Sequence, residues 1–440
     1  MKMSAVILSK YMARLCAAII ALMPFHAFLT VWLASLVGSY TLLRLWKEML
    51  LLVLFASAVV LIASQPKARA LCRGERIIWL AFVYVLFLIG MGLVGLLVGT
   101  VSPKAYAYGV LLDGRYLVFF GVTWLVTQYS DLLVRAWKKL LLIPASIVVG
   151  FATMQYTLLP ADFLRHFGYG PGTIAPSLTI DQKDAYQRIQ STLRGANPFG
   201  AYLVIILSSL GALILRTKRT WLGLAGFYVL AGLALVFTFS RSAWLGVLAS
   251  TAWLIWMAVT SNKLRKALLI AGAAATVSFG VVGYMLRDND NFQNIFFHTN
   301  EQSLSPESSN FGHANAVSKG VEDIIQEPWG RGTGSAGPAS VYNSAQPRIA
   351  ENYYIQIGQE AGIIGLGLFI AINVLVALRL WHRRDNSLAA VLLASFIGIT
   401  VINMLMHAWA DDTLAYIWWG LAGAAVALPV RHKKPNEVSE

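Results

Sequence analysis

Five ionisable residues in the second half of the chain have types and positions suited to binding an anion beside a general base. Arg188, Arg194 and Arg241 carry guanidinium groups, whereas His313 and Glu351 carry groups that accept protons. A guanidinium binds phosphate oxygens through paired hydrogen bonds, and an imidazole or carboxylate removes the proton of a reacting hydroxyl. These residue types therefore direct attention to phosphate binding and proton transfer.

The three arginines lie next to predicted helix starts. Arg241 is the only basic residue of the short turn 239–242, where the exposed N–H groups of a beginning helix also favour phosphate. Arg188 and Arg194 precede Pro198, a residue that favours the first turn of a helix, so with Arg241 they suit a diphosphate held without a metal. The alternatives are an interfacial, snorkelling Arg241 and two solvated loop arginines.

Both candidate bases have a structural alternative. Glu351 opens a predicted helix, where a carboxylate either complements the helix dipole or acts as a base at the membrane surface. His313 lies in a second predicted helix, 312–326, on the apolar stripe formed by Val317, Val321, Ile324 and Ile325. An inward histidine is either a packed structural residue or a base, since its ordinary pKa is near 6.5. We favour Glu351 as the base and keep His313 as the alternative.

Other polar patterns are assigned structural roles. Asp113 and Arg115 are two residues apart on a predicted helix and cannot face each other, so we expect ion pairs with another helix. The segment 330–334 (GRGTG) resembles a nucleotide loop but follows no strand, which predicts a turn. No two histidines are three or four residues apart, and the only cysteines are Cys16 and Cys72, so we expect neither a metal nor another cofactor.

Composition indicates which elements position these residues. The 440 residues are 57% hydrophobic and 13% charged, with a mean hydropathy of +0.63, which excludes a soluble enzyme. Because a helix needs about 20 apolar residues to cross a bilayer, we predict an all-α polytopic membrane protein of about twelve spans. The predicted spans are 11–37, 48–64, 77–99, 107–128, 138–158, 197–215, 220–238, 242–260, 267–286, 361–381, 388–406 and 412–430.

Basic residues alternate between the gaps and predict the orientation. The formal net charge is +14, and Lys and Arg cluster in every second gap, as in 67–76, 135–139 and 216–219. This pattern follows the positive-inside rule. We therefore expect the basic residues to contact membrane lipids and not nucleic acid. Both termini are predicted to be cytoplasmic, in a cytoplasmic (inner) membrane, with two long loops outside.

The spans divide the chain into six regions. Long loops of this kind are usually functional or disordered, and the second is predicted to be partly helical. The regions are 1–158 (helices 1–5), 159–196 (first outer loop), 197–286 (helices 6–9), 287–350 (large outer loop), 351–430 (helices 10–12) and 431–440 (cytoplasmic tail).

Three local patterns, in this order, resemble the O-antigen ligase and polymerase superfamily. Residues 192–203 (TLRGANPFGAYL) are similar to that family's entry from loop to helix, and residues 238–246 (TFSRSAWLG) to its Ser-Arg-x-x-x-Leu-Gly helix start. The third pattern is 328–334 (PWGRGTG), followed by 352–354 (NYY) and 360–365 (EAGIIG). The likeness covers about residues 185–420.

The resemblance implies a function and a site. Members transfer a glycan from an undecaprenyl-diphosphate donor on the outer face of the membrane, without a nucleotide sugar or a metal. The resemblance also implies that Arg194 and Arg241 hold the diphosphate of the donor. The family's usual histidine before Asn-x-Tyr is Glu351 here, so either this carboxylate or His313 is expected to be the base. Single displacement predicts inversion at the anomeric carbon.

Two questions stay open at this point. The acceptor hydroxyl belongs to a growing glycan, a lipid core sugar or a protein. The alternative function is a twelve-helix secondary transporter of a polar or anionic solute, although transporters place their charges near the bilayer midplane. Here the charged candidates lie toward the outside.

Overall fold

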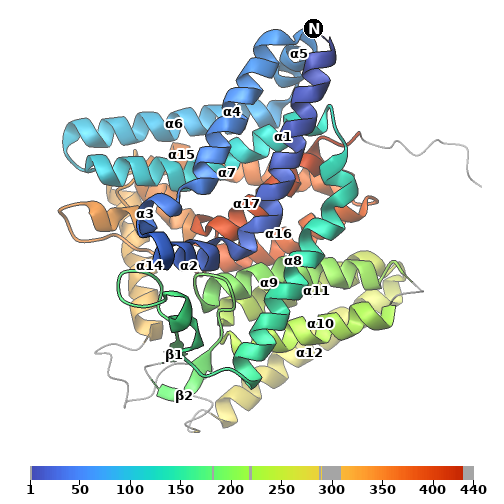
Figure 1. The fold of residues 1–440 in the computed structure, drawn as a ribbon. Helices are drawn as coiled ribbons and strands as arrows, with labels where there is room; N and C mark the ends of the chain where they lie inside the picture. The colour runs from blue at the N-terminus through green and yellow to red at the C-terminus, as the bar shows by residue number, and fades with distance from the viewer. Residues whose placement is uncertain (1, 181–182, 218–220, 287–288, 290–308, 430–440) are drawn as a thin grey trace, which may run out of the picture.

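The computed structural model describes residues 2–180, 183–217, 221–286, 289 and 309–429, and nearly all of its regular structure is helical (Figure 1). The predicted tail 431–440 lies outside these residues. In chain order the elements are α1 (Lys2–Leu22), η1 (Met23–Phe25), α2 (His26–Val37), α3 (Tyr40–Leu43), α4 (Trp46–Ser64), α5 (Pro66–Gly74), α6 (Arg76–Val98), α7 (Pro103–Thr127), α8 (Leu132–Thr157), η2 (Phe163–Phe167), β1 (Leu178–Ile180), β2 (Lys183–Arg188), α9 (Ala196–Ile214), α10 (Trp221–Phe237), α11 (Arg241–Ala258), α12 (Asn262–Met285), α14 (Ser309–Gln326), η4 (Gly337–Tyr342), α15 (Tyr353–His382), α16 (Ser387–Asn403), η5 (Ala408–Ala410) and α17 (Asp412–Val426).

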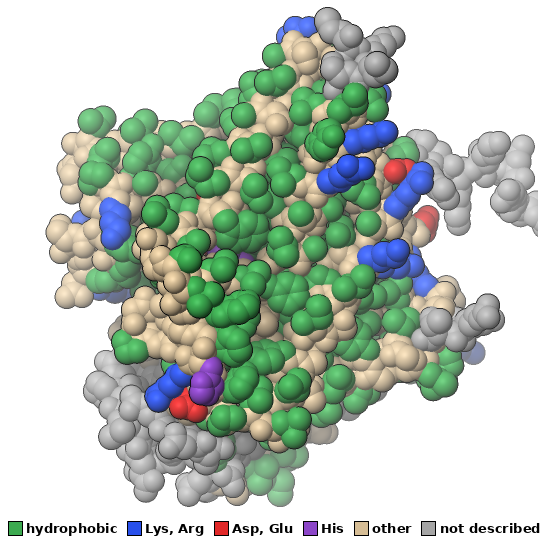
Figure 2. Space-filling view, viewed as in Figure 1, with side chains coloured by type: hydrophobic (Ala, Val, Ile, Leu, Met, Phe, Trp, Pro, Cys, Tyr) green, Lys and Arg blue, Asp and Glu red, His purple; other side chains and the backbone are tan. Residues whose placement is uncertain are grey.

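Helices occupy all twelve predicted spans, so the predicted all-α polytopic fold is confirmed. Within the described residues, six helical segments are long and apolar enough to cross a membrane, and α10 and α16 are apolar but shorter. Large apolar side chains such as Leu52 on α4 and Phe82 on α6 are exposed, as expected where a helix faces lipid. Figure 2 shows a surface that is mostly hydrophobic on the viewed side. Among the described residues, the only β-structure is a small antiparallel hairpin, in which Leu178 on β1 pairs with Arg188 on β2.

Aromatic side chains fill the core between α7 and α17. The Trp419 ring lies 5.3 Å from that of Tyr116 and 5.7 Å from that of Phe120, measured between centroids. Gly423 has no side chain to separate the two helices, and a Cβ there would collide with the Phe120 carbonyl. This close packing fixes the second half of α17 against the middle of α7.

Part of the large outer loop re-enters the membrane domain. Residues 332–337 are buried between α6, α7 and α15, where the Thr333 hydroxyl donates to the Leu88 carbonyl at 2.7 Å. The Glu360 carboxylate accepts hydrogen bonds from the backbone N–H groups of Gly334 and Ala336. α15 is broken at Gly362 (φ +65°), so backbone bonds from the loop can reach its first turns. Irregular backbone at membrane depth is tolerated when it is buried in protein, as this segment is.

Replacing Gly334 with Ala should therefore destabilise the fold. Gly334 has φ +95°, and a Cβ there would collide with the Ala105 carbonyl of α7. Left-handed strain and overpacking each cost about 1–3 kcal/mol, so we expect a loss of at least about 2 kcal/mol. Thermal unfolding in detergent, followed by size-exclusion chromatography, measures this. Gly312→Ala is the control, because nothing lies within 4 Å of a Cβ there.

The loop helix α14 packs against α15 through a glycine. A Cβ on Gly320 would meet Ile355, and Ile324 packs over Gly358. The apolar stripe predicted for this helix is only partly used, because Val321 is 44% exposed and Ile325 is 74% exposed. α14 lies near β1 and β2 at the lower left of Figure 1, at the end of the molecule opposite the N-terminus.

Candidate active site

Arg188 and Arg241 form a pair of neighbouring cations. Arg188 is the last residue of β2, and its guanidinium donates to the Thr238 carbonyl (2.8 Å) and the Asn197 side-chain oxygen (2.5 Å). Arg241 begins α11, three residues after Thr238. Burial, followed by the charge of Arg241, lowers the pKa of Arg188 to about 10, so both arginines are charged at pH 7. An anion placed between them would relieve their repulsion.

Arg194 is held from the other side by the start of α17. Its Nε donates to Asp411 Oδ2 at 2.9 Å, and Asp411 also caps α17 by accepting from the Leu414 N–H. Burial lowers the pKa of Arg194, but Asp411 and Asp412 outweigh it and raise the pKa above its ordinary value. The Arg194 side chain is 47% exposed, so its outer N–H groups face open space.

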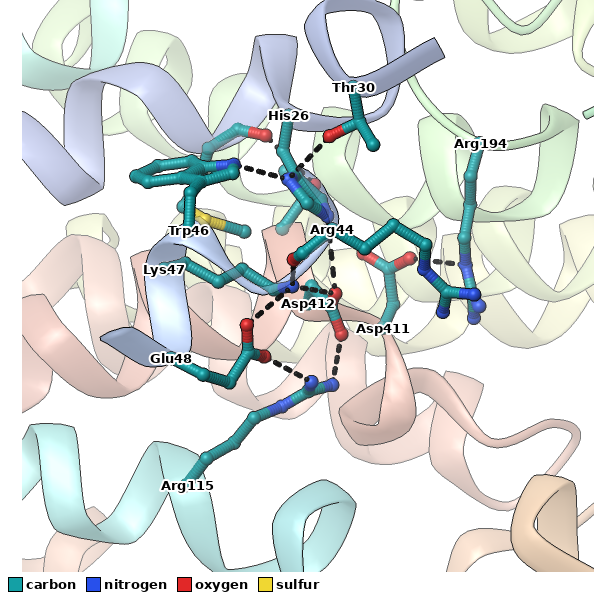
Figure 3. Close-up of polar contacts among 12 residues, drawn as sticks. His26, Thr30, Arg44, Trp46, Lys47, Glu48, Arg115, Arg194, Asp411 and Asp412 are labelled. Carbon is teal, nitrogen blue, oxygen red and sulfur yellow. Dashed lines mark hydrogen bonds and ion pairs between the residues drawn. The ribbon is translucent and has the colours of Figure 1, made fainter. Parts of the chain in front are cut away.

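Behind Arg194 lies a buried ionic network centred on Asp412 (Figure 3). Lys47 Nζ lies 2.9 Å from Asp412 Oδ2 and 3.0 Å from Glu48 Oε2. Arg115 contacts Asp412 and also lies 3.0 Å from Glu48 Oε1. His26 completes the group, with its Nε2 3.5 Å from Asp412 Oδ2. The network ties α2, α4, α7 and α17 together, and buried pairs of this kind leave costly charges when one partner is removed.

The two membrane residues that we predicted to form ion pairs behave differently. Arg115 forms the expected pairs with other helices. Asp113 forms none with a cation among the described residues, and instead accepts from the Tyr353 hydroxyl at 2.7 Å and the Gln356 amide at 3.4 Å. The expectation of an ion pair is therefore confirmed for Arg115 and wrong for Asp113, whose helix faces the polar start of α15.

His313 and Glu351, the two alternative bases, contact each other. His313 Nδ1 on α14 meets Glu351 Oε2 just before α15. Their side chains are 34% and 46% exposed, so the pair is accessible to a substrate. His313 also hydrogen-bonds to the backbone of Leu405. Burial, with the charges of His313 and Arg194, lowers the pKa of the neighbouring His407 to about 4, so that imidazole is neutral.

Arg194 also lines a cavity of about 330 Å³. Arg44 and Tyr40, from the segment before α4, and Asp411 line the same cavity, and Figure 3 shows the guanidinium of Arg44 pointing toward that of Arg194. Arg44 forms no ion pair within the described part of the chain. Sequence reasoning missed Arg44 and His407. The signal available in the sequence was that both residues lie between predicted spans, in gaps that are predicted to be outside and that contain few charged residues.

Left-handed backbone marks three of these positions. Ser191, Phe239 and Glu351 have φ of +52°, +50° and +52°, a region that non-glycine residues rarely occupy. Ser191 precedes Arg194, Phe239 precedes Arg241, and Glu351 is itself a candidate. Strained backbone clusters at functional sites, where the surrounding structure holds it in place.

The arrangement brings guanidiniums close to the His313–Glu351 pair. Arg241 interacts electrostatically with Arg188 and with His313, and Arg194 interacts with His407, which in turn interacts with His313. Paired guanidiniums stabilise a leaving diphosphate, and a nearby base accepts the proton of an attacking hydroxyl. Together, the guanidiniums and the base are chemically suited to transfer from a diphosphate-activated donor.

Comparison with known proteins agrees with this chemistry. Residues 226–370 match the family model described as O-antigen ligase, and that range contains Arg241, His313 and Glu351. No curated protein matches the chain. The match confirms the likeness indicated by the three motifs: residues 226–370 of this polytopic membrane chain are similar to the O-antigen ligase family.

Proposed function

We propose that the protein transfers a glycan from an undecaprenyl-diphosphate donor to a hydroxyl acceptor on the outer face of the cytoplasmic membrane. The observation that carries the proposal is the contact between His313 and Glu351, with the charge of Arg241 acting on His313, within the segment that matches the ligase family. The acceptor is a hydroxyl of a glycan, a lipid or a protein. A transporter is not favoured, because the match is to a ligase family.

The proposed step is a single displacement. The acceptor oxygen attacks the anomeric carbon, the bond from that carbon to the diphosphate oxygen breaks, and the diphosphate leaves with the electron pair. The guanidiniums of Arg194, Arg241 and Arg188 stabilise its developing charge. The hydroxyl proton passes to the His313–Glu351 pair, in which the carboxylate orients the imidazole.

An apolar groove supports a lipid-linked donor. The groove, of about 800 Å³, lies between α11, α15 and α16 and is lined by Trp253, Trp381 and Phe396 among others. Asn352 and Met404 line it as well, and Asn352 directly follows Glu351. A polyprenyl chain in this groove would bring its diphosphate to the candidate base.

The charge distribution supports the proposed orientation. Figure 2 shows Lys and Arg side chains gathered along the upper right edge, away from the end that holds β1, β2 and α14. By the positive-inside rule this distribution supports a cytoplasmic basic edge, with both termini inside and the candidate site outside.

Deletion of the gene tests the proposed function. Cells lacking the protein should accumulate a lipid-linked glycan, and the wild-type gene, but not a His313→Asn gene, should return it to normal. Extraction of lipids followed by mass spectrometry of the diphosphate-linked sugars measures this. An unchanged lipid-linked pool would refute the proposal.

The purified protein should work without a divalent metal and invert the anomeric centre. The arginines supply the charge that a metal would otherwise provide, so transfer should continue in excess EDTA. NMR of the donor and product linkages should show opposite anomeric configurations. Activity that EDTA abolishes and Mg²⁺ restores, or a retained configuration, would contradict this mechanism.

The pH dependence follows from the environment of His313. Burial lowers the pKa of His313, the hydrogen bond to the Leu405 backbone opposes this, and the charge of Arg241 lowers it again, for a net decrease from 6.5. The base must be neutral, so activity is lost as the pH falls through this lowered pKa. We expect kcat/KM to be constant near pH 7–8 and to decline below about pH 6.5. If kcat/KM already declines as the pH falls through a value above about 7, the Glu351 carboxylate raises the pKa of His313 by more than burial and Arg241 lower it.

A further inference from the structure

A second polar pocket lies between α14 and the chain segment 343–350. Its volume is about 430 Å³, within the range of small-molecule sites. Asn315 and Lys319 of α14 line one wall, Gln346 lines another, and Ser335 and Gln359 form part of the lining from the membrane domain. Neither the sequence motifs nor the proposed diphosphate clamp uses these side chains.

The buried lining has hydrogen-bonding atoms without partners. Ser335 and Gln359 are 5% and 2% exposed, yet Ser335 Oγ and Gln359 Oε1 have no hydrogen bond among the described residues. Gln359 is held in position because its amide nitrogen donates to Asp323 Oδ2 at 2.7 Å. Buried polar atoms are nearly always satisfied in proteins, so these two side chains have hydrogen-bonding capacity that the described residues leave unused.

The charges of the pocket are largely balanced. Arg348 pairs with Glu327 (2.6 Å) and Asp323 (3.7 Å), and Arg331 pairs with Glu327 (3.2 Å). Only Lys319 of the lining cations has no ion pair within the described residues. The pocket is therefore no strong anion site. Amide, hydroxyl and ammonium groups together match the alternating donors and acceptors of sugar hydroxyls.

The pocket adjoins the His313–Glu351 pair. Gly312 and Ala350 line it, and they directly precede His313 and Glu351 in the chain. A ligand in the pocket would thus have one end next to the candidate reacting groups.

We propose that this pocket binds sugar residues of the glycan that takes part in transfer. The inference rests on the proposed function and adds where the carbohydrate, rather than the diphosphate or the lipid, is recognised. Donor and acceptor glycans share the required chemistry, so the experiment tests both.

Thiol protection tests the pocket without requiring activity. In a Cys72→Ser background, with Cys16 buried, Asn315→Cys supplies a reporter thiol in the pocket and Glu322→Cys an exposed control on α14 outside it. One arm adds the sugar chain released by mild acid from the cell's lipid-linked pool. The other adds delipidated saccharide from the envelope of cells lacking the protein, which holds unused acceptor.

We expect one saccharide to slow maleimide labelling of Asn315→Cys about five-fold, the value for a site about 80% occupied, and to leave Glu322→Cys unchanged. The saccharide that protects the thiol shows whether the pocket binds the donor glycan or the acceptor glycan. Equal labelling of Asn315→Cys with and without both saccharides would overturn the inference.

Kinetics separate this inference from the proposed function. Gln346→Trp fills the pocket from its exposed rim and should raise the KM of the protecting substrate about ten-fold, with kcat within about two-fold. Gln326→Trp, at an exposed α14 position outside the pocket, should leave both constants unchanged. An unchanged KM in Gln346→Trp, measured beside an active wild type, refutes the sugar pocket alone. An inactive wild type refutes the proposed function, and the thiol protection then still decides the pocket.

Discussion

Replacing His313 with Asn reduces glycan transfer by at least about 100-fold, because a positioned general base typically contributes that much. Glu351→Gln is expected to lose a comparable factor, since it keeps the shape of the side chain but removes the carboxylate that contacts His313 Nδ1. The two groups act as one unit in this scheme, so the double variant should be no slower than the slower single variant. Rates with purified donor and acceptor, at equal amounts of folded protein, measure all three.

His166→Asn is the matched control, because this exposed histidine lies in η2 of the predicted first outer loop and is not part of the His313–Glu351 pair. A nearly silent Glu351→Gln beside an inactive His313→Asn would assign the base to the loop helix alone. Losses that multiply in the double variant would contradict a joint role.

The diphosphate clamp should be almost as sensitive. Arg241→Lys keeps the charge but loses the two-pronged geometry of the guanidinium, and removal of one charge-stabilising donor typically costs about 100–1000-fold in kcat. Arg194→Ala should lose a similar factor with near-normal expression. Arg188 is the weaker candidate, because its hydrogen bonds to Thr238 and Asn197 also give it a structural role.

Arg135→Lys is the control for the clamp, since Arg135 is 80% exposed and pairs only with Asp131 of the same helix among the described residues. Turnover at the wild-type rate by both Arg241→Lys and Arg194→Ala would reject the clamp. A rise in the donor KM alone, with kcat unchanged, would mean that the arginines bind the donor without stabilising the transition state.

Hydropathy was sufficient to predict the helices, because burial in hydrocarbon leaves a continuous signal along the chain. The pattern of α14 was less informative about which side packs. Periodicity counted Val321 and Ile325 as inward, whereas the contact with α15 uses Gly320, whose missing side chain gives no apolar signal. The prediction that His313 faces inward survives only in part, since its ring reaches Glu351 at a half-exposed position.

The segment 330–334 shows a different limit. Its glycines and polar residues are typical of an exposed turn, yet the structure buries it between helices. The reason lies far away in the chain, where Gly95 and Gly109 provide surfaces that accept a bare backbone. No local pattern can reveal such a match.

The candidate site was predictable as a set of residues and less so as an arrangement. The motifs singled out Arg194, Arg241 and Glu351. Helices α9 and α11 begin beside the two arginines as predicted, whereas α15 begins at Tyr353, two residues after Glu351. The contact between His313 and Glu351 depends on how α14 docks, and the role of Asp411 in holding Arg194 depends on where α17 begins. These are tertiary facts, so the sequence left the two bases as alternatives.

The re-entrant segment also constrains how the protein matures. Its hydrogen bonds join Arg331 to Thr100 across 231 residues and Thr333 to Leu88 across 245 residues. During synthesis α6 and α7 are complete long before this segment emerges, so the polar loop must enter between helices that already exist. The entropic penalty for closing so long a chain grows only slowly with length, but the closing partner does not exist until about three quarters of the chain is made. The packing of this segment is therefore a separate and late event in biogenesis.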